Sequence, residues 1–202
     1  QGRQTRHVAA RPLQARGEPV PHRIVSYGKH DRQGFGPLRK LADGLFGNRQ
    51  QQIRLLHMLA VAHGQLWNAT AVGQSLGLSY HTVNGYLDYL EGAYLIRRLP
   101  PWSGNLRKRL TRSPKVYLRD TGLLHALLRI GSRTELLRHP AAGASWEGFV
   151  IEQLLGTLAA SGIDAGAHFL RTSDGYEIDL LLALEGVTVA IELKLSAHAT
   201  PQ

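Results

Sequence analysis

Tyr176-Glu177-Ile178-Asp179, read together with Ile191-Glu192-Leu193-Lys194, is the stretch of sequence that decides the fold of the C-terminal part. Apolar residues follow the first stretch and precede the second, and Glu185-Gly186 between them is a turn signal. Two apolar runs joined by such a turn predict a β-hairpin. Because side chains alternate between the two faces of a strand, the two charged residues of each stretch are expected to share one face.

These stretches place carboxylates in strands that are otherwise apolar enough to form a core. Burying such charges is expensive unless they pair with each other or bind a metal ion. Converging carboxylates suit a hard divalent cation such as Mg²⁺, so Asp179 and Glu192 are candidate ligands. The competing interpretation is a surface hairpin with one solvated face, on which Glu192 and Lys194 form an ion pair of little energetic worth.

The amino-acid composition bounds the size of the core and argues against disulfide-bonded and membrane-spanning classes of protein. The chain has 202 residues, 43% of them hydrophobic, which is enough for one large domain or two small ones. It has no cysteine, which excludes disulfides and thiolate zinc sites and favours a reducing compartment. No apolar run approaches the length of a membrane span, and the N-terminus lacks the apolar core of a signal peptide. We therefore expect a cytoplasmic protein with no membrane partner.

Charge is unevenly distributed along the chain. Residues 1–120 contain 19 Lys and Arg against 6 Asp and Glu, whereas residues 121–202 contain 5 against 9. The formal net charge of +9 therefore divides into +13 and −4. A basic first part favours contact with nucleic acid, and an acidic second part fits a carboxylate-rich site. The alternative is that the basic charge only aids solubility.

Residues 1–36 are rich in Arg, Gln, Gly, Pro and His and have few large apolar residues. Such a segment cannot bury much surface, and it is predicted to be a loose arm. No part of the chain has the form G-x(4)-G-K-[ST] that cradles phosphates in P-loop proteins. ATP binding or hydrolysis by this chain is therefore not expected.

Residues 37–138 have the pattern of a winged helix-turn-helix domain. Asn68 and Thr70 are candidate N-caps of a first short helix and Ser79 is the candidate N-cap of a second, and Gly77 between the two helices is a stop signal. Two short helices joined by a glycine-containing turn are a helix-turn-helix signature. Apolar strands at 94–96 and 116–118 follow, with a basic loop between them that would form the wing.

The wing is expected to contact DNA phosphates. Its candidate residues are Arg107, Lys108, Arg109, Arg112 and Lys115. The second helix, Tyr80 to Gly92, has no Lys or Arg, so its candidates for contact with DNA are the polar residues His81 and Asn84. Winged helices also serve as protein-contact modules, and that alternative stays open.

Residues 139–144 are the predicted domain boundary, and residues 144–202 are predicted to form a partial α/β domain. An amphipathic helix over 145–161 carries Glu147, a strand follows at 168–171, and the charged hairpin completes the domain. The whole chain is thus predicted to be mixed α/β.

Several stretches share the order and residues of one family. They are Ala62-His63-Gly64-Gln65-Leu66-Trp67-Asn68, Leu99-Pro100-Pro101-Trp102, Ser113-Pro114-Lys115-Val116-Tyr117-Leu118-Arg119-Asp120-Thr121-Gly122-Leu123, Trp146-Glu147-Gly148-Phe149-Val150, and Arg171-Thr172 with Gly175 and Glu177-Ile178-Asp179. Over roughly residues 27–196 the chain resembles the C-terminal region of bacterial and archaeal AAA+ type ATPases. The resemblance implies a winged helix followed by a domain of unknown function with a PD-(D/E)xK, restriction-endonuclease-like core.

The resemblance also implies the positions of a nuclease-like site. Glu147 corresponds to the helix carboxylate, Asp179 to the first strand ligand, and Glu192 and Lys194 to the E-x-K pair. Asp179, Glu192 and the Leu193 carbonyl would hold Mg²⁺ or Mn²⁺, with Glu147 as a further ligand. Asp179, Glu192 and Lys194 are the candidate catalytic residues, Lys194 acting on the water or the phosphate.

Two departures from the family pattern matter. The P-loop ATPase domain is absent from this chain, so nucleotide chemistry is not implied for it. The chain also ends eight residues after Lys194, where the nuclease-like fold usually continues, so we expect a truncated domain with an unpaired sheet edge.

The predicted function is DNA binding by the C-terminal part of an AAA+ type ATPase-family protein, with a divalent-metal-dependent nuclease site. The alternative is a non-catalytic module that docks protein partners and regulates such an ATPase.

Overall fold

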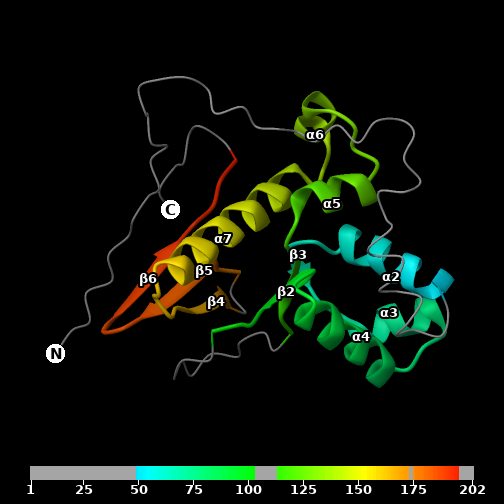
Figure 1. Ribbon diagram of the computed structural model, residues 1–202, viewed down its shortest axis with the longest axis horizontal. Coiled ribbons are helices and arrows are strands. Elements are labelled where there is room, and N and C mark those ends of the chain that lie inside the picture. The colour runs from blue at the N-terminus through cyan, green and yellow to red at the C-terminus, as the bar shows by residue number, and fades with distance from the viewer. Residues whose placement is uncertain (1–48, 103–112, 173–174, 196–202) are drawn as a thin grey trace.

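The computed structural model describes residues 49–102, 113–172 and 175–195 (Figure 1). The described chain is mixed α/β, as predicted, with helices and two three-stranded antiparallel sheets. The helices are α2 (Arg49–Val61), α3 (Ala69–Leu76), α4 (Tyr80–Gly92), α5 (Thr121–Leu127), α6 (Arg133–Arg138) and α7 (Ala142–Ala160). The strands are β1 (Gln65–Leu66), β2 (Ile96–Leu99), β3 (Lys115–Leu118), β4 (Gly166–Arg171), β5 (Glu177–Leu184) and β6 (Val187–Ile191).

Helices α2, α3 and α4 pack with the first sheet, whose strand order is β1-β3-β2. Of the two candidate caps of α3, Asn68 is confirmed, since its side chain accepts from the amide of Ala71, whereas Thr70 lies inside the helix. The cap of α4 is confirmed, since the side chain of Ser79 accepts from the amide of Thr82. Gly77 ends α3 in the left-handed region at φ 67°, where glycine has no Cβ penalty. Local signals therefore fix the two short helices, and a shared apolar core holds them against β3.

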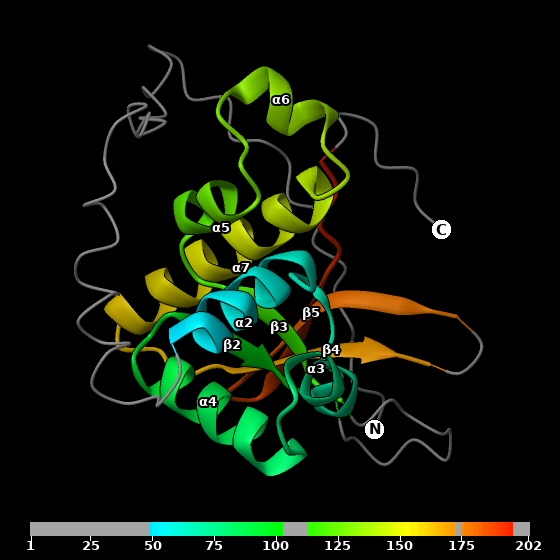
Figure 2. The same cartoon turned by 90° about the vertical axis from the view of Figure 1, so that its right-hand side faces the viewer.

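Helix α7 packs with the second sheet, whose strand order is β4-β5-β6. The predicted hairpin is confirmed, with Leu184 paired to Val187 and Gly186 at φ 75° in the turn. Helix α7 begins at Ala142, inside the stretch predicted to separate two domains, and its cap position Ala141 offers no side-chain hydrogen bond. Figure 2 shows α5 and α6 beside the first turns of α7.

The two sheets are joined by main-chain hydrogen bonds and by shared packing. The amide of Trp102 donates to the carbonyl of Phe169 at 2.7 Å, and the amide of Phe169 donates to Pro100 at 3.0 Å. Leu99 and Tyr117, from β2 and β3, belong to the apolar cluster under α7 and β5. Figure 1 accordingly shows β2 and β3 between the α2–α4 helices and the β4–β6 sheet.

A buried histidine connects the same two parts. His63, 2% exposed, accepts the amide proton of Leu118 on Nδ1 at 3.0 Å, and its Nε2 lies 3.2 Å from the carbonyl of Ala144. Both contacts are satisfied by the neutral ring with its proton on Nε2. Burial lowers the pKa of His63 to about 4, which keeps the ring neutral at pH 7.

Among the residues that the structure describes, we find no helix whose length and apolar character would let it cross a bilayer.

Candidate functional site

Carboxylates from α7 and β5 converge on one ammonium group, which comes from β3. Lys115 Nζ lies 3.1 Å from Glu147 Oε1, 2.7 Å from Glu177 Oε1 and 4.0 Å from Asp179 Oδ1. Glu177 and Asp179 reach the same point because they are two residues apart on β5 and share one face. Here we name these four residues the acidic cluster.

The acidic cluster is largely shielded from solvent. The side chain of Lys115 is 4% exposed, those of Glu147 and Asp179 are 15% exposed, and that of Glu177 is 33% exposed. The ring of Phe169 lies beneath the ammonium, with Nζ 5.6 Å from its centroid. A lysine this deeply buried is stable only with direct partners, and the carboxylates supply them.

Electrostatics keep Lys115 charged. Burial alone would lower its pKa, but the negative charge of Glu147 and the hydrogen bond to Glu177 outweigh that effect and raise it. Burial also raises the pKa of Glu147, and the nearby charge of Lys115 offsets only part of that rise. The Tyr117 hydroxyl donates to Glu147 Oε1 at 2.5 Å. Burial, with the charge of Glu147, raises the pKa of Tyr117 far above its usual range, so the phenol stays a donor.

The predicted E-x-K pair lies beside the acidic cluster, at the surface. Lys194 Nζ is 2.8 Å from Glu192 Oε1, and the two side chains are 55% and 51% exposed. The hydrogen bond to Glu192 is the main cause that raises the pKa of Lys194, and the charges of Asp179 and Glu147 add to it. The structure therefore brings Glu147 and Asp179 together and leaves Glu192 paired with Lys194.

Asp179 also holds the chain that leaves β6. Its Oδ2 accepts the amide proton of Leu193 at 2.8 Å. The Leu193 carbonyl was the predicted metal ligand, whereas the observed contact with Asp179 uses the amide of that residue.

In this arrangement the candidate ligands do not fit a divalent ion. Within residues 49–102, 113–172 and 175–195, no three His, Asp or Glu side chains are arranged to hold one. The ammonium of Lys115 lies between Glu147 and Glu177, so these two carboxylates already have a cationic partner from the protein.

The structure describes only some of the residues that were predicted to contact nucleic acid. Arg107, Lys108, Arg109 and Arg112 lie outside the described residues. Lys115 was grouped with them, but the structure buries its side chain and pairs it with carboxylates, so its ammonium is not presented to a phosphate.

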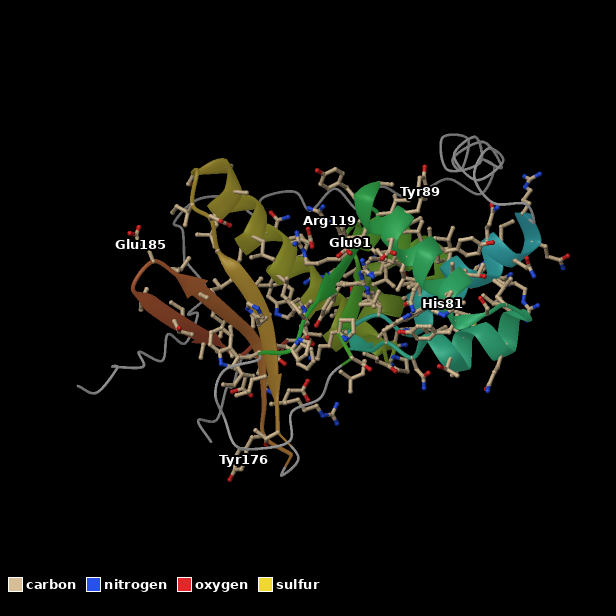
Figure 3. The ribbon with its side chains drawn as sticks, turned by 90° about the horizontal axis from the view of Figure 1, so that it is seen from below. His81, Tyr89, Glu91, Arg119, Tyr176 and Glu185 are labelled. Carbon is tan, nitrogen blue, oxygen red and sulfur yellow. The ribbon has the colours of Figure 1, made fainter. Side chains whose placement is uncertain are left out.

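His81 is exposed on α4, in edge contact with Tyr80, and Asn84 is half-buried on the same helix. Figure 3 shows His81 far from Glu185, which lies at the turn between β5 and β6. The exposed start of α4 and the second sheet therefore occupy opposite ends of the molecule.

The arginines beside β2 and β3 are engaged with carboxylates. Glu152 on α7 accepts from both Arg97 and Arg119, the latter at 2.8 Å. Arg98 Nε donates to Glu91 at 2.6 Å, and its guanidinium lies 2.8 Å from Asp88. Their charges are thus balanced within the protein.

Sequence reasoning missed the roles of Lys115, Tyr117 and Glu177. The signal present in the sequence was the alternation of β3, which places Lys115 and Tyr117 on one face. Nothing local to that strand indicates that this face meets Glu147, which is 32 residues further along the chain.

Comparison with known proteins gives two matched regions. Residues 39–134 match a family described as a domain of unknown function (DUF8612), and residues 142–202 match another domain of unknown function (DUF4143). Two curated relatives, uncharacterized proteins of Mycobacterium bovis and Mycobacterium tuberculosis, are each 46% identical to this chain over 137 residues. The aligned part covers 68% of this chain and 30% of each relative, so the chain spans about 30% of their length. The C-terminal part is thus similar to a domain of unknown function, and both relatives are longer proteins.

Proposed function

We propose that this chain is the DNA-binding C-terminal region of an AAA+ type ATPase-family protein. The match of residues 142–202 supports this, because that domain is typically found in C-terminal regions of AAA-ATPase-like proteins. The greater length of the two mycobacterial relatives is consistent with a region that works as part of a larger chain.

The arrangement of the first part supports a winged helix. The chain order is α2-β1-α3-α4-β2-β3, with β3 central in the sheet, and the residues between β2 and β3 would be the wing. In the proposed mode α4 lies against the duplex with His81 and Asn84, while the wing contacts phosphates.

One observation carries the proposal: the segment that connects β2 to β3 is strongly basic, and the arginines on either side of it are already paired. Arg97 and Arg119 share Glu152, and Arg98 is held by Glu91 and Asp88. In this proposal the positive charge that contacts DNA phosphates therefore comes from the connecting segment. Its basic residues are Arg107, Lys108, Arg109 and Arg112.

The test is binding to duplex DNA as a function of salt concentration. Phosphate contacts release counterions, so the logarithm of the affinity falls linearly with the logarithm of salt concentration, at about 0.9 per contact. Replacing Arg107 and Arg109 by Ala is expected to weaken binding to all sequences alike and to reduce that slope by about one unit per lost contact.

The matched control removes the same charge from exposed positions on α6, with Arg133→Ala and Arg138→Ala. An unchanged slope in the Arg107/Arg109 variant, or an equal loss in the control, would show that the basic segment does not contact phosphates.

We also propose a divalent-metal-dependent nuclease site as a second candidate. Its support is the convergence of Glu147 and Asp179, with Lys194 close enough for their charges to raise its pKa. The presence of Lys115 among these carboxylates favours the rival, a non-catalytic module that docks proteins.

Plasmid nicking with Mg²⁺ or Mn²⁺ separates the nuclease from the docking module. A nuclease nicks in the parent chain and loses that activity in Asp179→Ala and Lys194→Ala, whereas a docking module shows no metal-dependent nicking in any of the three.

A further inference from the structure

The solvent-facing side of helix α7 carries no charge. The helix contains only two charged side chains, and both are engaged with other elements of the protein: Glu147 accepts from Lys115, and Glu152 accepts from Arg119. The exposed positions on the opposite side recur at the spacing of a single helix face. We name these positions the α7 stripe, and they are Trp146, Phe149, Gln153, Gly156 and Ala160.

The two halves of the α7 stripe differ in the size of their side chains. Trp146 and Phe149 are 39% and 37% exposed, and their rings stack with centroids 6.0 Å apart. In the other half lie Gly156 and Ala160, and a Cβ added at Gly156 would have no heavy atom of the described residues within 4 Å. Figures 1 and 3 show α7 as the outer layer over the β4–β6 sheet. The stacked rings therefore lie on the surface next to open space.

We propose that the α7 stripe is the interface at which two copies of this chain associate, through an antiparallel pair of α7 helices. A two-fold axis at Gln153 places Trp146 of one copy beside Ala160 of the other, and Phe149 beside Gly156. Each large side chain thus meets a small one, and each contact occurs twice because both copies use the same surface. The two Gln153 amides meet at the axis, where each has a donor and an acceptor to offer the other.

Charge at the two ends of α7 favours the same orientation. The exposed Arg138 precedes the helix, and the exposed Asp164 follows it. Antiparallel packing brings the end of each α7 next to the beginning of the other, so opposite charges approach each other. Parallel packing would bring like charges together, which is unfavourable.

The size of the α7 stripe limits the strength of this association. The helix of 19 residues is about 28 Å long, and the exposed parts of its two aromatic side chains are roughly 60–100 Å² each. Such a contact is smaller than the roughly 800 Å² per partner of a standard stable interface. We therefore expect a weak dimer, with a dissociation constant above about 1 µM.

Sedimentation of the 202-residue chain from about 1 µM to about 1 mM tests the association. Gln153→Glu places two carboxylates together at the axis and is expected to raise the dissociation constant at least about tenfold. Gln74→Glu makes the same change at an exposed position of α3 and should leave the dissociation constant unchanged. A parent chain that stays monomeric throughout, or an equal loss in both variants, would overturn the inference.

Single cysteines test the orientation, because the chain has none of its own. On mild oxidation Gln153→Cys is expected to form a disulfide between two copies in native buffer and to lose it in urea. Ala160→Cys is not, because its two copies would lie about 21 Å apart along the helices, beyond the reach of a disulfide. Equal cross-linking of the two variants, or none in Gln153→Cys, would overturn the antiparallel pair. Should Gln153→Glu melt at a lower temperature than the parent, this comparison decides the inference.

Discussion

Gly148→Ala is expected to destabilise the protein although it improves the helix propensity of α7. A Cβ at this position would lie 2.6 Å from His63 Nε2, 2.9 Å from His63 Cε1 and 3.1 Å from Tyr117 Cδ1. Neither neighbour has room to move away, because His63 is 2% exposed and Tyr117 is fully buried. The His63 ring is further fixed by its contacts with Leu118 and Ala144.

The magnitude follows from three contributions. Overpacking a tight interior costs roughly 1–3 kcal/mol. Displacing the His63 ring from Ala144 costs about 1 kcal/mol for the hydrogen bond. Replacing glycine by alanine inside a helix stabilises the helix by up to about 1 kcal/mol, which offsets part of these costs. The net loss in the free energy of unfolding is therefore roughly 1–3 kcal/mol, or a decrease in melting temperature of about 2–12 °C for a chain of this size.

The same helix provides the control. Gly156 is also inside α7, and a Cβ there has no heavy atom within 4 Å. Gly156→Ala should therefore raise the melting temperature by up to about 4 °C, through helix propensity alone.

Urea and thermal unfolding of the parent and the two alanine variants, followed by circular dichroism, measure the difference. A Gly148→Ala variant as stable as the parent would refute the close approach of α7 to His63 and with it the described junction between the two parts of the chain.

Two further predictions follow from buried charge. The pKa of His63 lies at about 4 instead of 6.5, so below pH 6.5 the unfolded chain binds a proton that the folded chain does not. The stability that comes from keeping His63 neutral is complete above pH 6.5 and is lost as the pH falls towards 4, which lowers the free energy of unfolding by about 3 kcal/mol. Urea unfolding between pH 7 and pH 4 measures this loss. The loss should be smaller in His63→Gln, in which Glu147 and Glu152 still titrate. Glu152→Gln should lower the free energy of unfolding by roughly 1–3 kcal/mol, because Arg97 and Arg119 lose their shared carboxylate. Urea unfolding at pH 7 measures the difference, and a variant as stable as the parent would contradict the prediction.

Features encoded in neighbouring residues were predictable from the sequence. The caps at Asn68 and Ser79 and the turn at Gly186 depend on residues a few positions apart, and each is confirmed. Ser145 was the predicted start of α7, but the helix begins three residues earlier, at Ala142. The Ser145 hydroxyl is 2.8 Å from His125 Nε2, and this tertiary contact takes the place of a capping bond.

The composition of the acidic cluster was not predictable, for a related reason. The expected position of Glu192 assumed that strand alternation continues through Lys194, but β6 ends at Ile191. Beyond that residue the strand period no longer decides which way a side chain faces. The position of Lys115 depends on packing between segments 32 and more residues apart, and no local pattern in the sequence specifies it.

The acidic cluster and the His63 contacts together indicate that the two matched regions depend on each other. Residues 39–134 supply His63, Lys115 and Tyr117, whereas residues 142–202 supply the acceptor Ala144 and the carboxylates. Separation of the regions would leave Lys115 without its carboxylates and would expose apolar residues that now share one interior, such as Leu99 and Tyr117. Because an unpaired buried charge and newly exposed apolar surface both cost free energy, the two regions are expected to be stable together.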